Sequence, residues 1–140
     1  MNPIKIFIKD FLCYDYTEID FRNFNAALIL ACSNGNEEVS NGAGKSSFFR
    51  TIEYAIFNDA DMNLDRLIRD DTDYCHITFD FAVRDQVYRI VRKRTKSNVH
   101  DVSLYMKINP EAEHVFKTEE SVWKNLSGRR NSDTEKYIEA

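Results

Sequence analysis

Seven consecutive residues have side-chain types and a spacing that suit the binding of a polyphosphate. They are Asn41, Gly42, Ala43, Gly44, Lys45, Ser46 and Ser47. They match the second half of the phosphate-loop pattern G-x-x-x-x-G-K-[ST], in which glycines let successive backbone N–H groups point at the phosphates. Lys45 is expected to bridge the β- and γ-phosphates, and the Ser46 hydroxyl is expected to be one ligand of Mg²⁺. The predicted cofactors are therefore ATP and Mg²⁺.

The beginning of this loop departs from the pattern. Val39 stands where the pattern has its first glycine, and a β-branched residue does not easily adopt a positive φ. The stretch from Cys32 to Ser40 is also longer than a direct connection needs, so we interpret the residues SNGNEEV as an insertion. A surface glycine-rich loop that binds no nucleotide is the alternative explanation for this region.

A strand and a helix are predicted on either side of the loop. The continuous apolar run AALILAC, residues 26–32, is typical of a strand buried on both faces. After Lys45, apolar residues recur at helical spacing until Asn58 and Asp59, which form a plausible stop signal. The order strand, glycine-rich loop, helix is the one in which a helix N-terminus can face a phosphate.

Alternating apolar and polar residues predict further strands. Upstream, residues 3–9 and 16–21 form a hairpin-like opening, and a short amphipathic piece around Leu64, Leu67 and Ile68 follows the central helix. Downstream, three alternating runs joined by polar turns predict an antiparallel meander, with a short edge strand after it. These segments are residues 76–83, 86–93, 101–108 and 115–117.

Two more helices are predicted near the end of the chain. Thr118 has the character of an N-cap, and Val122, Trp123 and Leu126 follow it at helical spacing. The last helical pattern begins at Asn131 and runs to Ala140 without a stop signal. The expected fold is therefore α/β, with a mixed sheet and an antiparallel meander after the phosphate-loop helix.

Composition limits the remaining possibilities. A chain of 140 residues, 43% hydrophobic and 13% aromatic, is sufficient for one domain with a core, so residues 1–140 are expected to form a single unit. Lys5, Lys9 and Asp10 interrupt the N-terminus too early for a signal peptide, and no apolar run is long enough to span a membrane. We expect an intracellular protein, cytoplasmic or nucleoid-associated, with no membrane contact.

Cysteine, histidine and basic residues complete the survey of reactive side chains. The cysteines are predicted to be buried free thiols, and the histidines to be surface residues that form no metal site. The residues in question are Cys13, Cys32, Cys75, His76, His100 and His114. The net charge of −4 gives no general argument for nucleic-acid binding, but residues 89–96 are strongly basic. They form either a solvated strand or a DNA contact through Arg92 and Arg94.

The order of these segments resembles the N-terminal part of the ATPase heads of the SMC family, most closely the SbcC type. The residues IKIFIKDFLCYDYTEIDF resemble the first two strands of that head and the turn between them. ALIL followed by NGAGKSSFFRTIEYAIF is similar to its phosphate loop and first helix, and LIR with VYRIVR resembles the stretch that crosses the head. The resemblance covers almost the whole chain, although only the phosphate loop is sharply specific.

The resemblance implies a P-loop NTPase fold, the N-terminal lobe of an ABC-ATPase-like head. The expected partners are a second head lobe, a head dimer that sandwiches ATP, an SbcD-like nuclease and double-stranded DNA. Phe11, Leu12 and Cys13 stand in the turn where the family often has a basic residue near the nucleotide. The acidic strand motif, the signature motif and the glutamine loop of the family are not found here, so no catalytic residue is assigned.

Three functional hypotheses follow. The first is that the chain is the ATP-binding N-terminal segment, a fragment, of an ATPase in double-strand-break processing, recombination or repair. The second is an ATPase-deficient head mimic that binds a partner protein, a reading that Val39 and the insertion favour. The third is a P-loop kinase acting on a small molecule, which the antiparallel meander after the helix makes less suitable.

Overall fold

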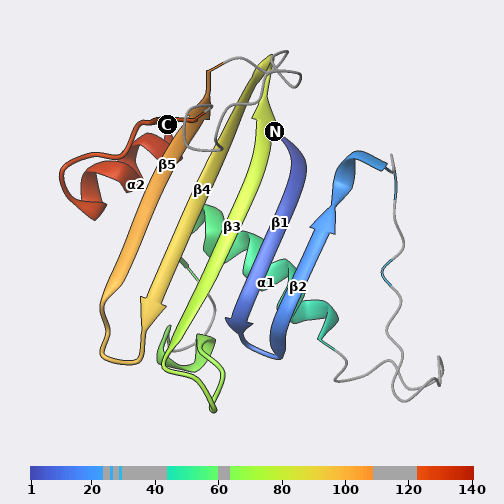
Figure 1. Ribbon diagram of the computed structural model, residues 1–140, viewed down its shortest axis with the longest axis vertical. Coiled ribbons are helices and arrows are strands. Elements are labelled where there is room, and N and C mark those ends of the chain that lie inside the picture. Colours follow the sequence, from blue (N-terminus) through green and yellow to red (C-terminus); the bar gives the residue numbers. More distant parts are fainter. Residues whose placement is uncertain (24–25, 27–28, 30–43, 60–63, 109–122) are drawn as a thin grey trace.

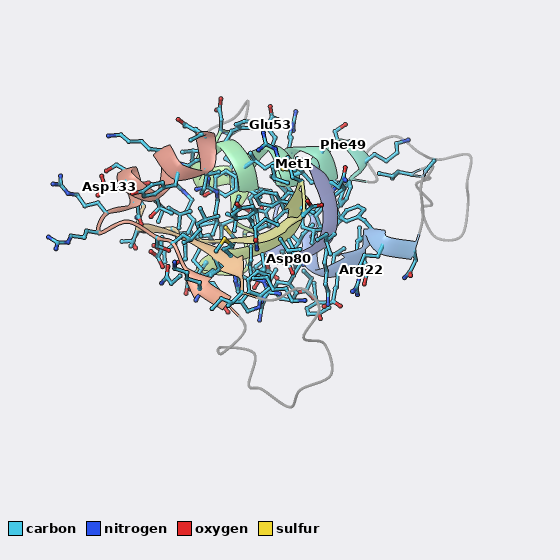
Figure 2. The ribbon with its side chains drawn as sticks, turned by 90° about the horizontal axis from the view of Figure 1, so that it is seen from above. Met1, Arg22, Phe49, Glu53, Asp80 and Asp133 are labelled. Atoms are coloured by element: carbon cyan, nitrogen blue, oxygen red, sulfur yellow. The ribbon has the colours of Figure 1, made fainter. Side chains whose placement is uncertain are left out.

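The computed structural model describes residues 1–23, 26, 29, 44–59, 64–108 and 123–140. In this part of the chain, six strands form one sheet, and two α-helices lie on one of its faces (Figures 1 and 2). All strand pairs are antiparallel, in the order β2-β1-β3-β4-β5-β6. The strands are β1 Asn2–Phe11, β2 Tyr14–Asp20, β3 Tyr74–Val83, β4 Gln86–Thr95, β5 His100–Lys107 and β6 Trp123–Asn125.

The predicted hairpin and the predicted meander are both confirmed. β1 pairs with β2 and also with β3, so the long connection after β2 returns the chain to the other side of β1. β3, β4 and β5 then follow as consecutive antiparallel neighbours, each joined by a short turn. The strand expected at residues 26–32, which would make the sheet mixed, lies largely outside the described residues.

The main helix, α1 Lys45–Phe57, begins and ends as its sequence indicates. Asn58 follows it in the left-handed conformation, with φ 54°, and its N–H donates to the Tyr54 carbonyl oxygen. This αL residue satisfies a terminal carbonyl, as asparagine often does after a helix. The last helix, α2 Asn131–Glu139, also confirms its prediction, and two 3-10 turns, η1 Phe21–Asn23 and η2 Leu64–Leu67, complete the described elements.

The core lies between the sheet and α1. Ile6 and Ile8 of β1 are completely buried, while the intervening Phe7 points to the opposite face, as the period-2 geometry of a strand requires. The helix contributes Phe48, Tyr54 and other apolar side chains to the same core. Tyr54 stacks on Phe11 with ring centroids 5.4 Å apart, so α1 is anchored where β1 ends.

One element prediction is wrong in its described part. Trp123–Asn125 forms β6, whereas helical spacing had indicated a helix that includes Trp123 and Leu126. β6 pairs with β5, and the Leu126 N–H donates to the Leu104 carbonyl oxygen at 2.8 Å. The Arg89 guanidinium also lies 4.3 Å from the centre of the Trp123 ring. Cross-strand pairing and this cation–π contact outweigh the local helical signal. Thr118, Val122 and the edge strand predicted at 115–117 lie outside the described residues.

The basic residues of β4 differ from both sequence interpretations. Arg92 and Arg94 are only 2% and 5% exposed, so neither belongs to a solvated strand and neither can contact DNA from this position. The Arg92 guanidinium donates to the carbonyl oxygens of Ala55 and Ile56, at 2.6 and 3.1 Å, and to the Glu135 carboxylate. Alternation along the strand turns these arginines toward the helices, which residue type alone does not indicate.

The cysteines and histidines partly depart from prediction. Cys75 is a buried free thiol, and burial raises its pKa to about 11. Cys13 is exposed, so its predicted burial is wrong, and Cys32 lies outside the described residues. His76 and His100 are half-buried rather than plain surface residues, and His114 lies outside the described part.

Candidate functional site

The N-terminal end of α1 carries the described half of the predicted phosphate loop. Gly44 is the residue before the helix, and Lys45, Ser46 and Ser47 are its first three residues. Asn41, Gly42 and Ala43 lie outside the described residues, so their placement stays a prediction. The described residues therefore place the last glycine, the lysine and the two serines of the loop at the start of α1.

Gly44 occupies a position that suits only glycine. Its φ of 86° lies in the left-handed region, which an L side chain rarely adopts. A Cβ atom on this residue would also lie 2.7 Å from Cys13 Sγ, closer than real Cβ contacts come. The first observation requires a residue without a Cβ, and the second shows that the backbone here lies close to Cys13 in the turn between β1 and β2.

Tyr14 fixes this backbone from the neighbouring strand. Its hydroxyl donates to the Gly44 carbonyl oxygen at 2.9 Å, and the same oxygen accepts the Phe48 N–H at 3.1 Å, the first bond of the helix. Burial, with a smaller effect of Cys13, raises the pKa of the Tyr14 hydroxyl, so it remains a donor at neutral pH. The orientation of the Gly44 peptide is thus set from two sides.

The first turn of α1 has the electrostatics of an anion site. Gly44, the N-cap residue, has no side chain with which to cap the helix, and the first turn contains no acidic residue. The N–H groups of the first turn have no partner within the helix, and they form the positive end of its dipole. Ser46 is exposed, while Lys45 and Ser47 are half-buried. An anionic group placed at this end meets backbone donors, a lysine and an accessible hydroxyl.

Packing behind the first turn holds the site in place. Thr51 is fully buried, and its hydroxyl donates to the Ser47 carbonyl oxygen at 2.7 Å. Phe48 is 6% exposed and packs against Phe21, with ring centroids 6.3 Å apart. The helix start is therefore supported from below by the core and from the side by the segment that follows β2.

The β1–β2 turn is the part of the site that the loop motif does not reveal. The Leu12 N–H donates to the Leu67 carbonyl oxygen at 2.7 Å, and the Arg69 N–H donates to the Asp10 carbonyl oxygen at 3.2 Å. The resemblance had implied only that residues of this turn lie near the nucleotide. That Tyr14 is the residue bonded to Gly44 could not be read from spacing, since 30 residues separate the two.

Comparison with known proteins assigns the chain to a family. A family model described as an AAA domain matches residues 5–139, nearly the whole chain. The chain belongs to the AAA domain family. This family comprises nucleotide-binding, ATPase-like domains that generally bind ATP with Mg²⁺. No curated protein sequence matches the chain.

The described residues of this AAA domain fit ATP and Mg²⁺. At Gly44 the backbone comes close to the β1–β2 turn in a space that a Cβ would fill, and the uncapped helix start beside it offers its amides. Lys45 and the amides of the first turn would hold phosphate oxygens, and Ser46 would be one ligand of Mg²⁺. When bound, ATP supplies the phosphoanhydride bond and Mg²⁺ neutralises charge on its phosphates.

The described residues of the AAA domain contain neither a cluster of metal-ligating side chains nor a membrane-spanning helix. Within this part of the chain, no group of three or more histidine, cysteine, aspartate or glutamate side chains could hold a metal ion. No helix in the described ranges is both long and apolar enough to cross a membrane.

Proposed function

We propose that this AAA domain binds ATP with Mg²⁺ through residues 41–47 at the start of α1. The observation that carries the proposal is Gly44, whose left-handed backbone is held against Cys13 and Tyr14 next to an uncapped helix N-terminus. Gly44 has no side chain that could cap the helix, and a polyphosphate at this position would accept hydrogen bonds from the amides of the first turn.

We further propose that the domain is the N-terminal lobe of an SMC/SbcC-like ATPase head. The hairpin before α1 and the antiparallel meander after it follow the order that this resemblance implies. The outer side of α1 is suited to packing against a second layer, because Phe49 and Phe57 are 59% and 58% exposed. They stand two turns apart with Glu53 between them, on the side away from the sheet, so a second lobe could bury them.

In such a head, ATP acts by holding the surfaces of two heads together. Two heads sandwich two ATP molecules, and the acidic residues for hydrolysis come from the other lobe, which this sequence does not contain. The role proposed for the present chain is to position the phosphates with Lys45 and the amides of α1, and Mg²⁺ with Ser46. The proposed setting is intracellular double-strand-break processing, recombination or repair, with an SbcD-like nuclease and double-stranded DNA as partners.

The test is calorimetric titration of the chain with ATP and Mg²⁺, compared with Lys45→Ala. We expect the variant to weaken binding at least about tenfold, since a lysine on the phosphates is a charge-assisted donor. Lys124→Ala is the matched control, because Lys124 is exposed on β6, at the opposite edge of the sheet from β2. Equal affinity of Lys45→Ala and the parent chain would refute the proposed site.

A specific observation favours one alternative function. Val39 replaces the first glycine of the loop pattern, which suits a head that has lost ATP binding and acts as a mimic for a partner protein. A folded chain with no affinity for ATP and Mg²⁺ would favour either a head that is incomplete without its second lobe or this mimic.

A further inference from the structure

The face of the sheet opposite α1 carries a second chemical pattern. In Figure 2 the labelled Asp80 of β3 lies on the other side of the sheet from Phe49 and Glu53 of α1. No described helix covers this side, which we call the open face. Side chains that alternate with the core residues of β1, β3 and β4 point there.

Three basic residues form a line across the open face. Strand register places Lys9 of β1 directly opposite His76 of β3, and His76 directly opposite Lys93 of β4. We call Lys9, His76 and Lys93 the basic row. Neighbouring strands are about 4.8 Å apart, so three basic groups stand within about 10 Å.

Two other basic residues on this face, Lys5 and Arg89, form ion pairs. Lys5 Nζ lies 2.7 Å from Glu18 Oε1, and Arg89 Nε lies 2.7 Å from Asp80 Oδ1. Among the described residues, no ion pair engages Lys9 or Lys93. Burial, and to a smaller extent Lys93 and Lys9, lowers the pKa of His76, so its imidazole is mostly neutral at neutral pH. The positive charge of the basic row is therefore carried by Lys9 and Lys93.

Aromatic rings flank this row. Phe7 makes edge contacts with Tyr16 at 5.2 Å and with His76 at 5.5 Å between ring centroids. Tyr16 lies opposite Lys9 at the β2 end of the row and is 63% exposed. An apolar or aromatic group could pack on this edge while anionic groups bind beside it.

We propose that the open face binds a short acidic segment of a partner protein. Its carboxylates pair with the basic row, and an aromatic or apolar side chain packs against Phe7 and Tyr16. The charge pattern favours this occupant over nucleic acid. Asp101 of β5 lies opposite Lys93 and limits the row to two cationic side chains, which suit a short acidic segment better than the extended run of phosphates of a nucleic-acid strand. This surface is independent of the ATP site.

Fluorescence anisotropy with a labelled peptide tests the proposal. The probe is a phenylalanine flanked on each side by two glutamates, and the matched probe replaces every glutamate with glutamine. We expect binding of the acidic peptide only. We expect Lys9→Gln with Lys93→Gln to weaken it about tenfold, since two exposed ion pairs with the peptide are lost. Added salt should weaken it as well.

The control variant is Lys124→Gln with Lys136→Gln. It removes the same charge from exposed lysines of β6 and α2, outside the basic row, and should bind the acidic peptide normally. Circular dichroism verifies that both double variants are folded. Equal affinity for the two peptides, or no binding of either, would overturn the proposal. Tighter binding of a single-stranded thymidine oligonucleotide, lost in the Lys9 and Lys93 variant, would assign the face to nucleic acid instead.

Discussion

Gly44 links the loop to α1 with a φ of 86°, and its carbonyl oxygen accepts hydrogen bonds from both Tyr14 and Phe48. Cys13 fills the space beside its Cα. A residue with these neighbours affects two properties at once: the stability of the helix start and the position of the amides that follow it. The same residue therefore connects folding with the proposed nucleotide site.

Gly44→Ala should lower the free energy of unfolding by about 1–2 kcal/mol from the left-handed backbone alone, with a further loss from the contact with Cys13 Sγ. Urea unfolding measures the total, and titration with ATP and Mg²⁺ should show weaker binding. Repeating the substitution in a Cys13→Ala background separates the two causes. Full recovery of stability there would mean that the backbone conformation costs nothing, contrary to our argument.

At the scale of elements, Arg92 joins three segments that are distant in sequence. It extends from β4 to the last carbonyl oxygens of α1 and to Glu135 on α2. A guanidinium at a helix C-terminus satisfies free carbonyl groups and opposes the negative end of the helix dipole. β4 and the two helices should therefore lose their mutual position together when Arg92 is removed.

Arg92→Ala should lower the free energy of unfolding by about 3 kcal/mol, because it leaves buried acceptors without their donor. Glu135→Ala should cost less, since Arg92 keeps both carbonyl partners. Urea unfolding compares these variants with Lys93→Ala, the exposed neighbour on β4, which should change stability by no more than about 0.5 kcal/mol. A loss no larger than that of Lys93→Ala would show that the Arg92 bonds are not stabilising.

For the molecule as a whole, α1 and α2 lie on one face of the sheet, and no described helix covers the other (Figure 2). α1 in turn buries only one side, since Phe49 and Phe57 are exposed on the other. A helix with apolar residues on both sides is suited to a place between two layers. This arrangement supports the proposal that a second lobe packs on α1.

Phe49→Asp combined with Phe57→Asp should reduce binding of a hydrophobic dye and self-association of the chain, measured by dye fluorescence and light scattering. The free energy of unfolding should fall by less than about 1 kcal/mol, because both rings are already largely in water. Tyr137→Asp on α2, where the ring is 62% exposed, is the matched control and should have a smaller effect on self-association. Equal effects of the two variants would show that the exposed rings of α1 promote self-association no more than the exposed ring of α2.

Local patterns in the sequence were sufficient for most elements. Alternation predicted β1, β3, β4 and β5, because a strand with one buried face repeats every two residues. Helical spacing and Asn58 predicted α1 and its end, since both depend on neighbours within one or two turns. The residue types of the loop were likewise sufficient to predict ATP and Mg²⁺ as ligands.

Tertiary structure alone decided which residues meet. Trp123–Asn125 became a strand because β5 offered pairing partners, and Arg92 turned inward because helix carbonyl groups and Glu135 were there to receive it. Tyr14 reached Gly44, and Lys9, His76 and Lys93 lined up, only through strand register and chain packing. The sequence by itself determined the elements and the chemistry of the loop, since these depend on short-range periodicity and residue type. Contacts between segments far apart in the chain depend on how whole elements pack, and no local pattern records that.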